Sequence, residues 1–276
     1  MTFAEALQQA KKLGVPVAKA RLLLGHILNN PPEHIFAYSE KELNPADFDS
    51  FIKMCKDLTD GKPITRILGV REFWSLPFAL SEATLDPRPD SETLIEAVLD
   101  HFKDKSIPLK ILDLGTGTGC LLLSLLHDYK KATGMGVDLN PKAVETATQN
   151  ATHLDLDARA TFQKGSWFDG VSEKFDTIIS NPPYISHIDY ETLDKNVRDY
   201  DPKLALVADN KGLACYEEII QQAPSHLNSD GILVLEIGYG QKDDICQILS
   251  DNEFMLIDCR KDLAGIDRCL IAQIQR

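Results

Sequence analysis

The residues best suited to chemistry form the segment "NPPY", residues 181–184, which follows the apolar run "FDTIIS". Each proline fixes its own φ and holds the residue before it extended, so the side-chain oxygen of Asn181 and the backbone carbonyl of Pro182 point in fixed directions. Together these oxygens can accept both hydrogens of one NH₂ group and orient its nitrogen for attack. Tyr184 offers a flat face to the amide or ring that carries this nitrogen, and the face also suits a cation. A rigid turn without a ligand is the alternative.

A glycine-rich segment, "ILDLGTGTGC", lies between a predicted strand and a predicted helix. Its glycines permit a tight turn and a close approach of the backbone to a ligand. The spacing G-x-G-x-G, with no basic residue nearby, favours a ligand that has a ribose but no phosphate. A plain strand-to-helix turn is the alternative. The residues of this glycine loop are Gly115, Thr116, Gly117, Thr118 and Gly119.

An acidic residue ends the next predicted strand. Asp138, in "GVDLN", comes 19 residues after Gly119, where a carboxylate can bind both hydroxyls of a ribose. Asp138 is also a candidate helix cap, but Asn140, directly before Pro141, fits that role better. Trp167, in the "GSWFD" that ends the third strand, is expected either to cover an adenine ring or to pack in the core.

The two motifs together indicate methyl transfer to nitrogen. "DLGTGTG" resembles the cofactor loop of S-adenosylmethionine (SAM) methyltransferases, and SAM carries a strongly activated methyl group. An amide nitrogen is a poor nucleophile, so the protein has to align nitrogen, methyl carbon and sulfur and to stabilise the charge that grows on nitrogen. This chemistry needs no metal and no general base, which predicts a nearly flat pH dependence. Asn181, Pro182 and Tyr184 are the predicted catalytic residues.

The pattern of apolar residues predicts two regions. Residues 1–60 are predicted to form helices with caps at Thr2 and Asn44, and two β-rich runs, "ITRILGVREFW" and "LPFALS", then predict a hairpin. From about residue 90, strands alternate with helices, which indicates an α/β fold with a mostly parallel sheet. The seven predicted strands are "LKILDLG", "TGMGVDL", "ARATFQKG", "FDTIIS", "GILVLEIG", "FMLIDCR" and "RCLIAQIQ".

We therefore predict a Rossmann-like class I SAM-dependent methyltransferase domain with a seven-stranded, mostly parallel sheet, residues 86–276. A small helical N-terminal domain, residues 1–75, precedes it, and a β-hairpin linker extends to about residue 85. The N-terminal domain carries none of the site motifs, so we expect it to recognise the substrate.

Two further segments are candidates for the site. "RPDSE", residues 88–92, is either a second wall of the site or a stiff linker, with Asp90 or Ser91 as the cap of the following helix. Residues 185–212 form a long connection after "NPPY", and connections of this length are often lids or binding loops.

Composition narrows the choice of partner. The net charge is −13 and the sequence has no Lys/Arg cluster, which counts against duplex DNA and is compatible with a basic protein. The six cysteines include no C-x-x-C pair, and no Cys/His group has metal-ligand spacing, so we expect buried thiols and no metal. The chain has no secretory signal and no apolar run that could span a bilayer. We expect a cytoplasmic monomer that binds neither membranes nor nucleic acid directly.

Six segments of the chain resemble the PrmC/HemK family, the glutamine methyltransferases of peptide chain release factors. They occur in that family's order from about residue 64 to the end, and the N-terminal helices match the family in length and character. The segments are "LGVREFWSLPFAL", "DPRPDSETLIE", "ILDLGTGTGC", "SNPPYI", "LVLEIGYGQ" and "KDLAGIDRCLI". One departure is Asp201 in "RDYDPKLAL", where the family more often has Glu before the proline, so the role of this shorter acid stays open.

The resemblance implies an enzyme of translation termination that methylates the glutamine of the GGQ loop of a release factor and leaves S-adenosylhomocysteine as product. It also implies that the N-terminal helices recognise the release factor. By position, SAM is bound by Gly115, Thr116, Gly117, Thr118, Gly119, Asp138 and Trp167, with a contact from Asn181. The substrate glutamine is held by Asn181, Pro182, Pro183 and Tyr184.

Two other functions stay open from the residues alone. Adenine-amino and cytosine-amino DNA methyltransferases carry motifs of the "NPPY" form, and an adenine-amino enzyme is the main alternative. Such an enzyme extrudes its base from the duplex and is expected to show a basic surface or an added target-recognition segment, which this sequence lacks. A non-catalytic SAM-binding protein is expected to lack the intact pair of Asn181 and Pro182.

Overall fold

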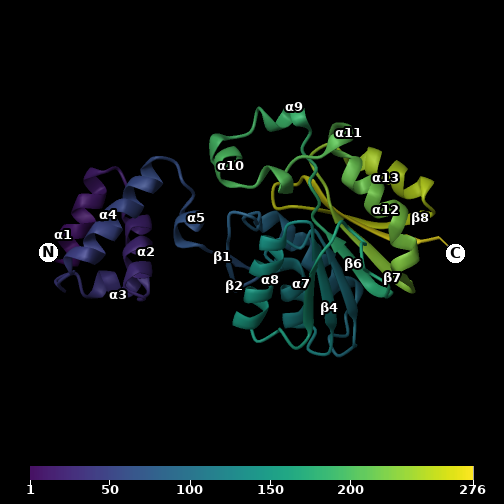
Figure 1. Cartoon of the computed structure of the whole chain (residues 1–276), viewed down its shortest axis with the longest axis horizontal. Helices are drawn as coiled ribbons and strands as arrows, with labels where there is room; N and C mark the ends of the chain where they lie inside the picture. Colours follow the sequence, from purple (N-terminus) through teal and green to yellow (C-terminus); the bar gives the residue numbers. More distant parts are fainter. Residues whose placement is uncertain (276) are drawn as a thin grey trace. The chain divides into compact units, whose positions relative to one another are not determined.

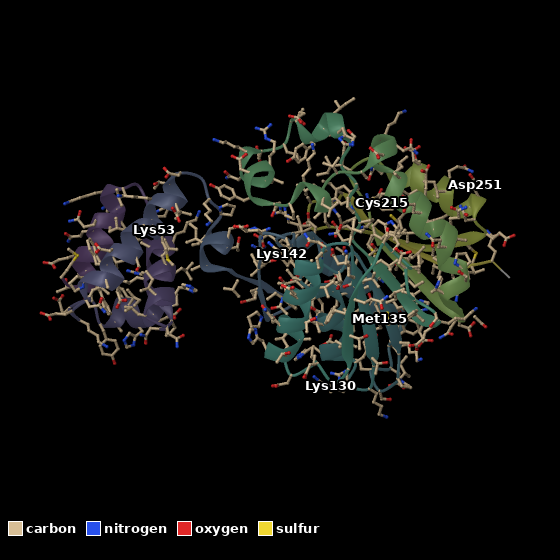
Figure 2. All side chains as sticks on the ribbon, in the orientation of Figure 1. Lys53, Lys130, Met135, Lys142, Cys215 and Asp251 are labelled. Atoms are coloured by element: carbon tan, nitrogen blue, oxygen red, sulfur yellow. The ribbon has the colours of Figure 1, made fainter. Side chains whose placement is uncertain are left out.

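The computed structural model describes residues 1–275 and divides into two compact units, with the boundary after Val70. The first unit is helical, and the second contains a seven-stranded sheet with helices on both faces (Figure 1). Charged side chains such as Lys130 and Asp251 lie on the outside of the second unit, whereas Met135 belongs to its sheet (Figure 2). The hairpin residues from position 71 onward group with the second unit.

Helices make up most of the first unit. They are α1 (Phe3–Lys12), α2 (Val17–Ile27), α3 (Pro32–Ala37), α4 (Pro45–Thr59) and α5 (Ile64–Leu68). The predicted caps are confirmed: Thr2 and Glu5 exchange both hydrogen bonds of a capping box, and Asn44 accepts from the N–H of Asp47. Buried apolar side chains of the first four helices, among them Phe51, form a core of this unit.

Residues 64–68 differ from the prediction. The run "ITRIL" was expected to begin a strand, but it forms helix α5. Pro63 stands directly before this helix, and Gly69 ends it in the left-handed region with a φ of 69°. Proline at the start and glycine at the end of a segment favour a helix, and here they outweigh the β-propensity of the isoleucines.

The predicted hairpin is confirmed, although it is shorter than expected. It consists of β1 (Val70–Phe73) and β2 (Leu76–Ala79), which pair as a two-stranded sheet. The turn residues, Trp74 and Ser75, have positive φ values of 52° and 59°. Positive φ at both turn positions matches the twist of a tight two-residue hairpin.

The predicted α/β fold is confirmed by a seven-stranded sheet with the order β5-β4-β3-β6-β7-β9-β8. Its strands are β3 (Lys110–Leu114), β4 (Thr133–Asp138), β5 (Ala160–Lys164), β6 (Phe175–Ser180), β7 (Leu227–Glu236), β8 (Phe254–Lys261) and β9 (Asp267–Ile274). The first five of these strands pair in parallel, and β9 runs antiparallel to both of its neighbours. Each of the seven lies where the sequence predicts a strand.

Helices cover both faces of this sheet (Figure 1), and apolar side chains of the strands are buried on each face. On one face, Ile111 and Ile179 pack with α6, α7 and α8. On the other face, Leu112 and Ile178 pack with α12 and α13. Because both faces are covered, the strands read as almost continuous apolar runs. The helices are α6 (Glu92–His101), α7 (Cys120–Asp128), α8 (Pro141–His153), α12 (Ala214–His226) and α13 (Lys242–Asp251).

The long connection after "NPPY" folds into short helical turns. These are α9 (His187–Tyr190), α10 (Lys195–Tyr200), the 3₁₀ turn η2 (Lys203–Ala205) and α11 (Asp209–Gly212). The N–H of Ile185 donates to the carbonyl of Leu206, and the N–H of Ala208 donates back to Ile185. These two bonds close the connection into a loop whose ends are held together.

Candidate functional site

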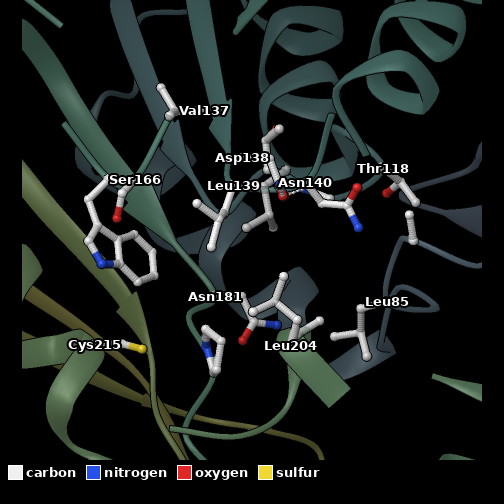
Figure 3. A pocket seen from close by; sticks show the side chains of 18 of the residues that line it. Leu85, Thr118, Val137, Asp138, Leu139, Asn140, Ser166, Asn181, Leu204 and Cys215 are labelled. Atoms are coloured by element: carbon white, nitrogen blue, oxygen red, sulfur yellow. Dashed lines mark hydrogen bonds between the residues drawn. The ribbon is translucent and has the colours of Figure 1, made fainter. Parts of the chain in front are cut away.

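A cavity of about 470 Å³ opens at the carboxyl ends of β3, β4 and β6 (Figure 3). Open α/β sheets bind their ligands at this position. Segments that lie far apart in the sequence line it. They are most of the glycine loop, residues 137–140, residues 165–167, residues 181 and 183, and parts of residues 83–91 and 204–218.

The glycine loop joins β3 to α7 and requires left-handed backbone. Gly117 and Gly119 have φ values of 56° and 80°, at which a side chain is strained. A Cβ at Gly119 would also lie 3.1 Å from the Leu123 side chain and 3.3 Å from that of Ala147. Residues 115–118 line the cavity, whereas Gly119 supports the loop against these two neighbours.

Asp138 lies at the cavity and holds the glycine loop in place. Its Oδ2 accepts from the N–H of Gly117 at 2.9 Å, and its Oδ1 accepts from the N–H of Asn140 at 2.8 Å. Burial raises the pKa of Asp138, and these two hydrogen bonds oppose the rise. The cap of α8 is Asn140, as predicted, because its side chain accepts from the N–H of Lys142. Asp138 is therefore left for the loop and the cavity.

A buried amide supports the glycine loop from behind. The Nδ2 of Asn150 in α8 donates to the carbonyl of Thr118 at 2.9 Å and to that of Ala79 at 3.1 Å. Its Oδ1 accepts from the N–H of Ala79 at 2.8 Å. Asn150 thus joins the hairpin to the glycine loop. Its place in a polar helix sequence carries no signal of this role.

A second acid lies beneath the loop. Asp113 of β3 is almost fully buried, and its Oδ2 accepts from the hydroxyl of Thr116 at 2.6 Å. Burial raises the pKa of Asp113 to about 7, while the hydrogen bond from Thr116 lowers it. The pair fixes the side chain of Thr116 in the loop. An acid two residues before the first glycine of the loop is the sequence signal that points to this pair.

Trp167 forms one wall of the cavity and also packs in the core. It lines the cavity, and its ring lies 3.7 Å from the position that a Cβ on Gly115 would take. The same side chain packs against the core on the α12 face of the sheet. Its φ of 48° is uncommon for a residue with a large side chain, and such strain often occurs at binding sites. Both roles predicted for Trp167 are compatible with this position.

The "NPPY" segment directly follows β6. The hydroxyl of Ser180, the last strand residue, donates to the carbonyl of Leu114 at 2.7 Å and so fastens the end of β6 to the end of β3. Asn181 and Pro183 line the cavity, and Pro182 is buried. The structure thereby brings Asn181 to the same cavity as the glycine loop and Asp138 (Figure 3).

Ser91 serves the site rather than the helix. It was a candidate cap of α6, but its side chain makes no capping hydrogen bond. It ends the 3₁₀ turn η1 (Pro89–Ser91), where its Oγ donates to Oε2 of Glu236 at 2.5 Å and accepts from Nδ2 of Asn181 at 3.2 Å. The prediction that this segment forms a second wall rests on these contacts and on Arg88, which also lines the cavity.

Glu236 had no predicted role, yet it ends β7 in the same way that Asp138 ends β4. An acid at the carboxyl end of a buried strand is the signal that identifies both. Burial raises the pKa of Glu236 to about 7, and the hydrogen bond from Ser91 and the charge of Arg268 oppose the rise.

The side chain of Tyr184 is partly buried in the protein interior. Its ring packs with the core on the α12 face, and its hydroxyl donates to Oε1 of Glu236 at 3.4 Å. Its carbonyl accepts from the side chain of Gln241 at 3.0 Å. Burial raises the pKa of Tyr184 well above its usual value. Among residues 1–275 the cavity lining includes neither Tyr184 nor Pro182.

Asp201, the departure from the family pattern, has a structural contact. Its carboxylate forms an ion pair with Arg88 at 2.6 Å, and its second oxygen lies 3.4 Å from the N–H of Asp86. The shorter acid therefore reaches residues 86–88 and ties the connection after "NPPY" to the wall that contains Arg88. The Asp201 side chain is buried, whereas 38% of the Arg88 side chain is exposed, so solvent screens part of this pair.

Two classes of feature are absent from residues 1–275. No group of three or more His, Cys, Asp and Glu side chains is arranged to hold a metal ion. In the same range, no helix combines the length and apolar character needed to cross a membrane.

Models of two known families match most of the chain. A model of the methyltransferase domain matches residues 105–269, and a model of the PrmC N-terminal domain matches residues 2–69. A methyltransferase from Pyrococcus furiosus shares the fold, with a TM-score of 0.54 at 17% identity over 73% of this chain and 90% of that one.

Several curated relatives are named release factor glutamine methyltransferases. A release factor glutamine methyltransferase of Rhodospirillum rubrum is 40% identical over 258 residues, which cover 94% of this chain and 79% of the relative. One of Vibrio cholerae serotype O1 is 40% identical over 271 residues, which cover 98% of this chain and 93% of the relative. The chain belongs to the family of release factor glutamine methyltransferases.

Proposed function

We propose that this protein transfers a methyl group from SAM to the side-chain amide nitrogen of the glutamine in the GGQ loop of a peptide chain release factor. The observation that carries the proposal is the shared cavity: the glycine loop, Asp138 and Asn181 all line it. A cofactor held by the glycine loop and Asp138 has its reactive end near Asn181.

The residues of the cavity fit SAM. The carboxylate of Asp138 suits the two hydroxyls of a ribose, and Trp167 and Leu139 offer apolar faces to an adenine ring. Backbone groups of the glycine loop approach the ligand without side chains in between. When bound, SAM supplies an electrophilic methyl group on a sulfonium. We assign SAM binding to residues 115–119, Asp138 and Trp167, with Asn181 nearby.

The "NPPY" segment orients the substrate amide. The carbonyl of Pro182 lies in the chain between Asn181 and Pro183, which both line the cavity. This carbonyl and the Oδ1 of Asn181 accept the two hydrogens of the glutamine NH₂ group and turn its nitrogen lone pair toward the methyl group. The same two oxygens stabilise the positive charge that develops on nitrogen. Pro183 and Tyr184 hold the segment in this shape. The proton leaves afterwards, because a methylated, cationic amide nitrogen is strongly acidic.

The first unit serves the protein partner. The exposed ring of Phe36 carries the guanidinium of Arg21 over its face at 4.7 Å, and aromatic residues with arginine are typical of protein contacts. Phe36→Ala should raise KM for the release factor about tenfold and leave SAM affinity and kcat unchanged. Met255→Ala, at an exposed apolar residue of the edge strand β8, is the matched control. Equal kinetics of both variants would remove Phe36 from the docking surface.

A transfer assay tests the function itself. The purified protein is incubated with methyl-labelled SAM, a release factor and duplex DNA as competing acceptor. We expect label in the release factor alone, and none in a release factor whose GGQ glutamine is replaced. Label in the DNA would favour the adenine-amino alternative instead. Because release factors act on ribosomes, we place the enzyme in the cytoplasm. We further propose that it is a monomer and that its product from SAM is S-adenosylhomocysteine.

A further inference from the structure

The orientation of the Asn181 amide decides what it can do. An asparagine side chain has an oxygen that accepts and an NH₂ group that donates, and the two ends have nearly the same shape. Only the orientation with Oδ1 toward the cavity can accept a hydrogen from a substrate NH₂ group. With the reverse orientation, two donors would face each other. The catalytic role of Asn181 therefore requires a device that fixes this orientation.

The device is a chain of two hydrogen bonds that runs from Asn181 through Ser91 to Glu236. The Oε2 of Glu236 lies 2.5 Å from the Oγ of Ser91, and this Oγ lies 3.2 Å from the Nδ2 of Asn181. Ser91 is 3% exposed and Glu236 is 1% exposed, so water does not compete for these groups. The three residues come from η1, the end of β7 and the end of β6, and 90 and 145 residues separate the bonded pairs.

The direction of the chain follows from the chemistry of its ends. An ionised carboxylate only accepts hydrogen bonds, so the single hydroxyl hydrogen of Ser91 goes to Glu236. The Oγ of Ser91 then has only lone pairs left and needs a donor. Asn181 can meet that need only with its NH₂ group. Its Oδ1 is thereby turned away from Ser91 and left for a ligand in the cavity, which Asn181 and Ser91 both line.

We propose that Glu236 is a positioning residue which, through Ser91, locks the Asn181 amide with its oxygen facing the substrate. The proposal rests on the proposed function for its catalytic consequence, while the locking itself is a property of the folded chain. The other carboxylate oxygen of Glu236 accepts from the hydroxyl of Tyr184 at 3.4 Å. One buried acid thus fixes both Asn181 and Tyr184, the polar and aromatic residues of "NPPY".

Three variants test the serial order of this chain. Glu236→Gln keeps the shape but can offer an NH₂ group to Ser91, and Ser91→Ala removes the link. At pH 8 each should lower kcat about 10- to 100-fold, as misplacement of a reacting group does, and SAM affinity should be unchanged in Glu236→Gln, because Glu236 is not part of the cavity lining. The double variant should be no slower than the slower single variant, because both changes break one chain. Losses that multiply in the double variant, or full activity of Glu236→Gln, would overturn the proposal.

Tyr216→Phe is the matched control. The Tyr216 hydroxyl donates to the backbone carbonyl of Glu236 at 2.9 Å, so its removal disturbs the same residue without touching the chain to Ser91. We expect kcat of this variant within about twofold of the parent. A loss as large as that of Glu236→Gln would mean that general loosening of the site, and not the chain to Asn181, sets the activity.

A spectroscopic readout separates this inference from the proposed function. The side-chain NH₂ signals of Asn181 are assigned by their loss in Asn181→Asp with ¹⁵N-labelled protein. Ser91→Ala and Glu236→Gln should shift these signals and speed their exchange with water, while Tyr216→Phe leaves them in place. Ser91→Ala removes only one buried hydroxyl. Unchanged Asn181 signals in this variant would refute the proposed locking of Asn181, whether or not the protein proves to be a methyltransferase.

Discussion

The two sides of the cavity are built differently. The cofactor side, which consists of the glycine loop and Asp138, depends on backbone groups: Asp138 accepts from two backbone N–H groups within 21 residues of it. The acceptor side, which consists of Asn181, Ser91 and Glu236, depends on side chains 90 and 145 residues apart. A backbone site is specified by one short motif, whereas a side-chain site requires the whole sheet to be assembled.

The two sides also differ in the consequence of a single change. On the cofactor side, most of the contacts come from a loop whose backbone persists when one side chain is lost. On the acceptor side, each buried polar group satisfies the next, and removal of one leaves another unpaired at a cost of about 1–3 kcal/mol. Substitutions on the acceptor side should therefore lower kcat, and those on the cofactor side should weaken cofactor binding.

The largest effect is expected on the acceptor side. Asn181→Ala removes one of two fixed acceptors for the glutamine NH₂ group and should lower kcat about 10²- to 10³-fold. Affinity for SAM should change far less, because the glycine loop and Asp138 stay intact. Steady-state kinetics with a release factor, combined with calorimetry for SAM, measures both quantities. A variant that lost SAM binding and kept kcat would reverse the assignment of the two sides.

A smaller effect is expected on the cofactor side. Asp138→Ala removes the charged acceptor for the ribose and releases the N–H of Gly117, so SAM affinity should fall by about 1–3 kcal/mol. Asp138→Asn retains one acceptor oxygen for the loop, so its SAM affinity should lie between those of the parent protein and Asp138→Ala. Calorimetric titration with SAM measures both variants. Unchanged affinity of Asp138→Ala would remove Asp138 from the cofactor side.

The smallest effect is a pH dependence that the sequence does not predict. Because burial raises the pKa of Glu236 to about 7, this acid takes up a proton as the pH falls through 7 and can then donate to Ser91. The hydroxyl hydrogen of Ser91 then no longer has to go to Glu236, and the amide of Asn181 is no longer held in one orientation. Activity is therefore present above the pKa and lost below it, and kcat should fall about tenfold from pH 8 to pH 6.

Glu236→Gln should flatten this acid limb. The charged and titratable groups that face Glu236 are Asp90, Cys120, Tyr184, Tyr216, Arg268 and Cys269. Burial raises the pKa values of the two phenols and the two thiols, so they do not titrate between pH 6 and 8. An acid limb that persisted in Glu236→Gln would point to Asp113, whose pKa burial also raises to about 7.

The fold could be predicted from the sequence because the local signals of strands and helix caps agree with the alternation of strands and helices along the chain. Strand runs, the Asn140 cap and the capping box at Thr2 each lie within a few residues, and all are found in the structure. The exception, α5, shows how Pro63 and Gly69 at its ends outweigh β-propensity. The cavity position also followed from a general rule, since parallel strands bring their carboxyl ends to one edge.

The acceptor side could be predicted only in part. Asn181 follows from the rigid "NPPY" segment, but the link from Ser91 to Glu236 joins η1 to β7, and no local pattern specifies that contact. A serine before a helix is usually a cap, and that expectation failed because a buried carboxylate is the stronger partner. Tyr184 was expected beside the ligand, and in the structure its ring packs against the core on the α12 face.

One measurement tests the central claim most directly. A release factor is incubated with SAM and either the parent protein or Asn181→Ala, and tandem mass spectrometry then locates the methyl group in its peptides. We predict one added methyl group on the GGQ glutamine with the parent protein, formed about 10²- to 10³-fold more slowly with Asn181→Ala. A methyl group on another residue, or equal rates for the two proteins, would contradict the account.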